Sequence, residues 1–261
     1  MSISTCITDY IDKNYKSYIT KNNTNNSPYS PFFVYISGPQ GSGKSYTTHK
    51  LHAYYTARNI NVIAVSIDDF YLNHREQMVL NEQSDNPLIN QGRGLPGTHD
   101  LKKLRDFMHQ CMCYNTTTSM VHVPQYDKSK YNGEGDRIDD ILVMRPGSDT
   151  LQVKTNGVVL YDTLDMVLIE GWFIGYEPVR RENIVNDKYM VEINENLRQY
   201  SDILWDNPKL FSDNVNEACI IVFKTNSDIV STVEKWRIQQ EHDLKLKNGG
   251  AGQLPMIIRQ N

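Results

Sequence analysis

The sequence lacks long apolar runs, is poor in cysteine and has no strong excess of charge of either sign. No stretch approaches the roughly 20 apolar residues that span a bilayer, and residues 1–9 lack the basic and apolar regions of a signal peptide. With 27 basic and 31 acidic residues the net charge is −4, which gives no general attraction to nucleic acid or an anionic membrane. We therefore expect a cytoplasmic protein with neither kind of partner.

Cysteine is too scarce to define a structural framework. Cys6, Cys111, Cys113 and Cys219 form neither a disulfide pattern nor a zinc pattern in a chain of 261 residues. Apolar residues make up 39% of the chain, which is enough for one sizeable core. The composition therefore predicts a single domain over residues 1–261, and we expect a monomer or a homodimer without a sequence feature that decides between them.

Continuous apolar runs without alternation indicate strands that are buried on both faces of a parallel sheet. These runs are residues 32–37, 62–67, 166–169 and 218–223. Helical patterns lie between or beside them, at residues 1–20, 46–58, 101–113, 194–204 and 229–247. Strands interleaved with helices predict an α/β fold with a doubly wound, mainly parallel sheet flanked by helices.

Three other segments lie outside this regular pattern. Residues 1–27 are predicted to be an N-terminal helix followed by a polar linker. Residues 72–100 and 124–157 are long, polar and rich in glycine, proline, asparagine and aspartate. Loops of this length in a compact domain are usually functional, and ligands of such folds lie beyond the carboxyl ends of the strands. We therefore expect both ranges to be acceptor-binding loops.

The first predicted strand leads into a glycine-rich segment that matches G-x-x-x-x-G-K-[ST], the Walker A pattern of a P-loop NTPase, at residues 38–45. Glycines allow the backbone N–H groups to point at phosphate oxygens. Lys44 would bridge the β- and γ-phosphates of ATP, and the Ser45 hydroxyl would ligate Mg²⁺. The predicted nucleotide-binding residues are Gly38, Pro39, Gln40, Gly41, Ser42, Gly43, Lys44, Ser45 and Tyr46.

Acidic residues follow two of the other predicted strands. Asp68 and Asp69 end the second strand, and Glu170 ends the third. A kinase acting on an alcohol needs one carboxylate to orient and deprotonate the acceptor and another acid to hold magnesium. Acids in such positions also cap helices, and this alternative is strongest for Asp69.

Several short segments resemble one known family, the plant-type D-glycerate 3-kinases and their fungal relatives, over most of residues 32–247. They are residues 38–45, 66–72, 92–100, 124–129, 133–137, 170–172 and 236–239. That family belongs with phosphoribulokinase, uridine kinase and bacterial pantothenate kinase. The resemblance implies that Asp68 is the catalytic base and that Glu170 is the acid associated with magnesium.

The resemblance also implies an acceptor pocket and a lid. Tyr126, Asp127 and Arg137 match positions that line the pocket, and Arg237 matches a basic lid residue within residues 229–250. A lid excludes water from the phosphoryl group, although a solvated basic helix face would have the same pattern. The family pattern continues past the lid with another helical segment, whereas this sequence ends at residue 261.

The glycine-rich segment at residues 92–100 adds two candidates for binding an anionic acceptor. Arg93 and His99 could contact a carboxylate, and Asp100 is placed to cap the helix that begins at Leu101.

Together these features predict a magnesium-dependent kinase that transfers the γ-phosphate of ATP to a hydroxyl of a small metabolite. A hydroxy acid like D-glycerate is the first candidate, by resemblance. The alternative is an ATP-binding regulatory switch, or an ATPase without a metabolite acceptor. A third class, a P-loop enzyme acting on nucleic acid, is disfavoured by the slightly acidic composition.

Overall fold

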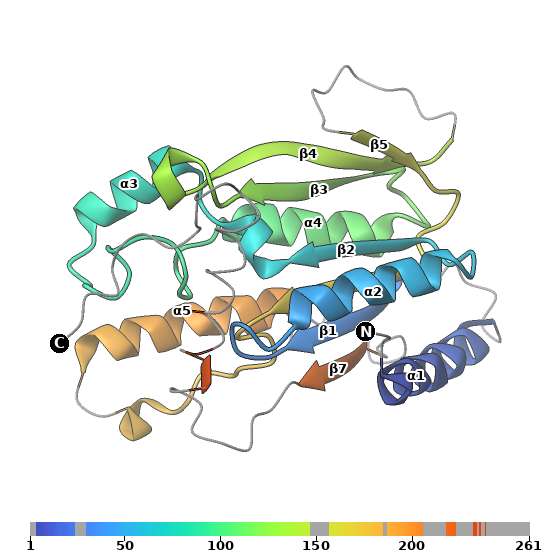
Figure 1. Cartoon of the computed structure of the whole chain (residues 1–261), viewed down its shortest axis with the longest axis horizontal. Coiled ribbons are helices and arrows are strands. Elements are labelled where there is room, and N and C mark those ends of the chain that lie inside the picture. Colours follow the sequence, from blue (N-terminus) through green and yellow to red (C-terminus); the bar gives the residue numbers. More distant parts are fainter. Residues whose placement is uncertain are drawn as a thin grey trace.

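A computed structural model describes residues 4–23, 30–146, 157–184, 187–205 and 218–222, together with residues 232, 233, 235 and 238. The helices are α1 (Thr5–Asn23), α2 (Lys44–Thr56), α3 (His74–Gln83), α4 (Leu101–Cys113) and α5 (Lys188–Leu204), with short 3-10 helices η1 (Ile67–Phe70), η2 (Tyr131–Gly133) and η3 (Arg181–Asn183). The strands are β1 (Phe32–Ser37), β2 (Val62–Ser66), β3 (Met120–Asp127), β4 (Asp136–Met144), β5 (Gly157–Leu160), β6 (Met166–Gly171) and β7 (Ala218–Val222). Figure 1 shows their arrangement.

The main sheet is parallel and has the strand order β2-β6-β1-β7. Its register aligns the carboxyl ends of the strands, because Ser66 of β2 lies opposite Glu170 of β6, and Ser37 of β1 lies opposite Gly171. Segments that leave these strands therefore start from one edge of the sheet. Ligands of open α/β sheets bind at this edge.

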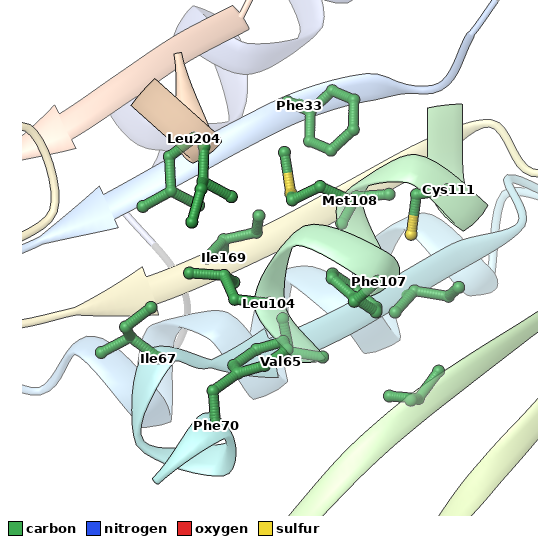
Figure 2. Close-up of a cluster of buried hydrophobic side chains, with 14 of the residues drawn as sticks. Phe33, Val65, Ile67, Phe70, Leu104, Phe107, Met108, Cys111, Ile169 and Leu204 are labelled. Carbon is green, nitrogen blue, oxygen red and sulfur yellow. The ribbon is translucent and has the colours of Figure 1, made fainter. Parts of the chain in front are cut away.

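Helices cover both faces of the main sheet, and successive strand residues supply the two halves of the core. Phe33, Val65 and Ile169 point towards α4 and α5, where they pack with Phe107 and Leu204 (Figure 2). The intervening residues point the other way and pack against α1 and α2. They include Phe32, Val34, Val62, Met166 and Leu168. Successive residues of each strand therefore point to opposite faces of the sheet, and both faces are buried. Every position can then be apolar, which is why the apolar runs show no alternation.

A second sheet has the order β3-β4-β5, with β3 antiparallel to β4 and β5 parallel to it. The prediction of one long loop over 124–157 is therefore wrong where β3 and β4 lie, whereas the residues between these strands form a turn that contains η2. The other predicted loop, 72–100, contains α3. Val121 and Val123 of β3 are buried towards α4, whereas His122 between them is half-buried. A sheet covered on one face keeps polar residues on the other, which gives its strands a loop-like composition.

The predicted strands of the main sheet and the first three predicted helices are confirmed to within four residues, and α5 begins six residues before the predicted Asn194. The predicted helix at 229–247 and the lid at 229–250 lie mostly outside the described residues. No helix in the described ranges is long and apolar enough to cross a membrane. The fold is the expected α/β architecture, with a mainly parallel sheet flanked by helices.

Candidate active site

The glycine-rich loop 38–45 joins β1 to the first turn of α2. Gly41 and Gly43 have φ values of 80° and 90°, a left-handed conformation that side chains disfavour. Gly43 is the N-cap of α2, and no side chain there accepts a hydrogen bond from the first turn. The N–H groups of that turn are left for a ligand, and the positive end of the helix favours an anion.

Lys44 and Ser45 begin α2 and face the end of β6. The Ser45 hydroxyl donates to Glu170 Oε1 at 2.7 Å, and Lys44 Nζ lies 3.9 Å from Glu170 Oε2 and 3.3 Å from the carbonyl oxygen of Pro39. Lys44 and Glu170 are both buried. Burial lowers the pKa of Lys44, while the carboxylates of Glu170 and Asp68 oppose that shift. A cation, a hydroxyl and a carboxylate therefore converge beside the loop.

In the acidic pair after β2, one carboxylate caps the turn and the other makes its contacts outside the cap. Asp69 Oδ2 accepts the Ser66 N–H at 2.8 Å, and Ser66 Oγ accepts the Asp68 N–H at 3.2 Å, which caps η1. Burial raises the pKa of Asp69 to about 6. Asp69 thus has the capping role that the sequence left open, and the carboxylate of Asp68 takes no part in the cap.

Asp68 instead pairs with Lys128, from the turn that follows β3. Lys128 Nζ donates to Asp68 Oδ2 at 2.5 Å, and the two side chains are 35% and 21% exposed. Burial is the largest single influence on the pKa of Asp68 and acts to raise it. The charge and hydrogen bond of Lys128, with help from a hydrogen bond of Tyr71, outweigh burial and hold that pKa below its ordinary value. Asp68 is therefore a carboxylate at neutral pH.

His99 lies beside this pair as a buried, neutral ring. It is 4% exposed and stacks on Tyr71 with ring centroids 4.3 Å apart. Burial lowers its pKa to about 4. The Gly97 N–H donates to the Tyr200 hydroxyl at 3.0 Å, and that hydroxyl lies 2.8 Å from His99 Nδ1. Because the hydroxyl oxygen accepts the Gly97 N–H, we assign its own proton to the hydrogen bond with Nδ1, which makes Nδ1 the acceptor. The ring proton of His99 is then on Nε2, which has no partner among the described residues.

Arg93 and Tyr126 connect the glycine-rich segment 92–100 to the turn at residues 133–135. Arg93 Nη1 donates to the carbonyl oxygen of Gly133 at 2.7 Å and also to that of Glu134, and its guanidinium lies 5.6 Å from the Tyr126 ring centroid. Gly135 has φ 82°, and a Cβ there would come within 2.5 Å of the Tyr126 ring. This close approach requires glycine, and it fixes the ring against the turn.

Arg137 and Asp127 have structural partners in this structure. Arg137 donates to Asp100 Oδ2 at 2.8 Å and to the Tyr71 carbonyl at 2.9 Å. Asp100 caps α4, as predicted, by accepting the Lys103 N–H. Asp127 Oδ1 accepts hydrogen bonds from the backbone and hydroxyl of Ser129, which lower its pKa. Arg137 thus links the segment after η1 to the start of α4, and Asp127 stabilises the turn after β3.

The structure brings Lys44, Ser45, Asp68 and Glu170 to the carboxyl edge of the main sheet, with His99 beside Asp68. Arg237 lies outside the described residues. Lys128 was missed as a site residue, although it directly follows Asp127 in the segment 124–129 that carries the resemblance. A separate open cavity of about 390 Å³ between α3 and α5, lined by residues such as Asn86 and Glu192, contains none of these side chains.

Comparison with known proteins finds related kinases. Over 229 residues, or 84% of this chain and 70% of the relative, the sequence is 39% identical to "Probable ATP-dependent kinase TDA10" of Saccharomyces cerevisiae. It is 28% identical to the chloroplastic D-glycerate 3-kinase of Arabidopsis thaliana, over 85% of this chain and 43% of that protein. No protein-family model matches the sequence.

A solved structure of a kinase is similar to this chain in both fold and sequence. It is the D-glycerate 3-kinase from Cryptococcus neoformans var. grubii, with a TM-score of 0.70 and 29% sequence identity. The match covers 94% of this chain and 81% of that one. The resemblance inferred from the short motifs is thereby confirmed, and with it the α/β fold.

Proposed function

Because the chain belongs to the family of ATP-dependent kinases that includes the yeast protein, we propose that it transfers the γ-phosphate of ATP to a hydroxyl of a small hydroxy acid, D-glycerate being the first candidate. One observation carries this proposal. The carboxylate of Asp68 takes no part in the cap of η1 and lies at the same sheet edge as the glycine-rich loop. The names of two relatives, both D-glycerate 3-kinases, supply the acceptor.

The phosphates of ATP would bind at the N-terminus of α2. The left-handed Gly41 and Gly43 let the loop present N–H groups to oxygens, and Lys44 adds a full positive charge. Lys44 is 8% exposed and contacts the Glu170 carboxylate and the Pro39 carbonyl, so its ammonium is already directed into the loop. Such preorganised charge stabilises the transferring phosphoryl group without rearrangement.

Mg²⁺ fits the donor set beside this loop. Ser45 Oγ and Glu170 Oε1 are hard oxygen donors 2.7 Å apart, and Glu170 is 6% exposed. The described residues contain no cluster of three or more His, Cys, Asp or Glu that could hold a metal. That absence suits Mg²⁺, which is commonly bound by one or two carboxylates together with substrate phosphates. Ser45 and Glu170 would hold the Mg²⁺ ion. When bound, the ion would neutralise charge on the phosphates.

Asp68 would orient the acceptor hydroxyl and receive its proton. Its pKa lies below the ordinary value, so it is ionised at neutral pH and ready to accept a hydrogen bond. A base this weak takes the proton late, as the new bond to phosphorus forms. Its main contribution is then to hold the oxygen in line.

The acceptor pocket would be formed around Asp68 by His99, Tyr126 and Arg93. His99 offers a neutral, buried Nε2–H without a partner among the described residues, which suits a hydroxyl or carboxylate oxygen. Arg137 and Asp127 would act through the groups they hold, Asp100 and the turn after β3. Arg237 remains the proposed lid residue.

The test is acceptor-dependent formation of ADP. The purified chain is incubated with ATP, Mg²⁺ and a panel of hydroxy acids, polyols and nucleosides, and ADP is measured against a reaction without acceptor. We expect D-glycerate or a close hydroxy acid to raise ADP formation and to yield a phosphorylated acid by mass spectrometry. The proposal fails if no member of the panel exceeds the reaction without acceptor.

A further inference from the structure

Lys128 is the cation that pairs directly with Asp68. It follows β3, which belongs to the second sheet, so it reaches the edge of the main sheet from a separate element. Its ammonium is 2.5 Å from Asp68 Oδ2, and its side chain is 35% exposed. Its charge also affects Lys44. Lys128 therefore lies against the carboxylate that would receive the acceptor proton, and its charge reaches the lysine of the loop that would hold the phosphates.

The other cations near Asp68 are already engaged. Arg137 is held by Asp100 and the Tyr71 carbonyl, and Arg93 by two carbonyls of the turn at 133–134. Lys44 points into the glycine-rich loop and pairs with Glu170. His99 is neutral at physiological pH. Among the described residues, Lys128 is thus the cation that forms an ion pair with Asp68, and its side chain is exposed enough to meet an incoming anion.

The pair with Lys128 also restricts the use of Asp68. The ammonium contacts Oδ2, and Tyr71 also donates a hydrogen bond to this carboxylate, so an acceptor hydroxyl shares or replaces one of these contacts. An acceptor with its own carboxylate offers Lys128 a new ion pair in exchange for the old one. A neutral acceptor offers no such replacement, and an ammonium left without a partner in a partly buried site is unfavourable.

We propose that Lys128 selects hydroxy acids: its ammonium holds Asp68 in the free enzyme, moves to the acceptor carboxylate when a hydroxy acid binds, and frees Asp68 for the hydroxyl. This inference rests on the proposed function and goes beyond it by naming the group that recognises the acid. Lys128 is then a specificity-determining residue that touches the acceptor. Arg93 and Arg137 keep the pocket in shape.

The test compares two acceptors of the same shape, D-glycerate and its neutral amide, D-glyceramide. Wild-type enzyme should use the acid with a kcat/KM about 10- to 100-fold higher, the effect of one hydrogen bond to a charged group. Lys128→Met should raise the KM for D-glycerate by a similar factor, leave the KM for ATP unchanged and abolish the preference for the acid. Lys128→Arg should restore most of the preference.

Lys130→Met is the matched control, because Lys130 lies two residues away in the same turn and contacts the Arg137 carbonyl and Asp136 instead of Asp68. It should keep the wild-type preference. The inference is overturned if Lys128→Met keeps that preference, loses both acceptors equally, or changes the KM for ATP alone, while the wild-type kinase activity still supports the proposed function. If wild-type enzyme forms no acceptor-dependent ADP, the proposed function fails and the selection of hydroxy acids fails with it.

Discussion

The site as proposed has a phosphate side, around Lys44 and Glu170, and an acceptor side, around Asp68, and the two are held by different kinds of groups. On the phosphate side, main-chain geometry dominates: left-handed glycines, the first turn of α2 and the aligned ends of β1 and β6 fix the positions of Lys44 and Glu170. On the acceptor side, side chains from η1, the turn after β3 and the segment 92–100 meet through ion pairs and ring contacts.

This difference indicates which parts of the site tolerate substitution and which do not. A main-chain cradle tolerates little change, because its geometry depends on positive φ values. An ion pair such as Asp68–Lys128 can be replaced by another pair without moving the backbone. We therefore expect ATP use to withstand few substitutions in the loop, and acceptor choice to change through single side chains around Asp68.

A large separation of the two sides should come from Lys44→Met. Loss of this buried ammonium removes one of the preorganised charges at the phosphates, so kcat/KM for ATP should fall by about 100- to 1000-fold. Nucleotide affinity should also fall, while binding of D-glycerate measured by calorimetry stays unchanged. Lys50→Met, on the exposed part of the same helix, should behave like wild type. Equal losses of ATP and acceptor binding would show that the two sides are not separate.

A smaller effect, on stability, should come from His99 on the acceptor side. Its pKa of about 4 in the folded chain lies below the 6.5 of an unfolded histidine, so the unfolded state binds more protons between those values. Its contribution to stability is therefore complete above pH 6.5 and is lost as the pH falls towards 4, by up to about 3 kcal/mol.

This loss is measured by comparing two proteins at two pH values. The free energy of unfolding is determined for wild type and His99→Asn at pH 7 and at pH 4.5, and wild type should lose more on acidification than the variant. Burial raises the pKa of Asp69 to about 6, so Asp69 acts in the opposite direction over the same range, but this effect is common to both proteins and cancels. His109→Asn, at an exposed position, is the control, and an equal loss in wild type and His99→Asn would contradict the assigned burial of His99.

The smallest effect should come from Gly43→Ala in the loop. A Cβ at Gly43 would meet nothing within 4 Å, so the cost is the strain of a φ of 90°, about 1–2 kcal/mol. Thermal unfolding should shift to lower temperature and the KM for ATP should rise. Gly157→Ala is the control, because that position is also open and has no positive φ. Equal melting temperatures for both variants would mean that the loop does not need its left-handed backbone.

Sequence predicted the phosphate side well because its determinants are local. The apolar run 32–37, the spaced glycines and the residues of α2 are contiguous, so strand, loop and helix can be recognised together. The strand-end acids Asp68 and Glu170 were also found, because parallel strands present their carboxyl ends at one edge. The capping role of Asp69 had to be left open, since it depends on hydrogen bonds to Ser66.

The acceptor side was harder to predict because its contacts join distant segments. Lys128 meets Asp68 across 60 residues of chain, and Arg137 meets Asp100 across 37. The turn that carries Lys128 is positioned by β3 and β4, whose polar outer faces made residues 124–157 resemble a loop. A one-sided sheet gives a weak periodic signal, and no local pattern indicates which carboxylate a lysine will reach.

The most direct test of the proposed kinase reaction is Asp68→Asn, compared with Asp106→Asn on the exposed face of α4. ATP binding is measured by calorimetry and acceptor-dependent turnover by ADP formation. If Asp68 orients and deprotonates the acceptor, Asp68→Asn should bind ATP like wild type and lose about 100- to 10,000-fold in kcat, while Asp106→Asn keeps full turnover. Wild-type turnover in Asp68→Asn would contradict a role for this carboxylate in phosphoryl transfer.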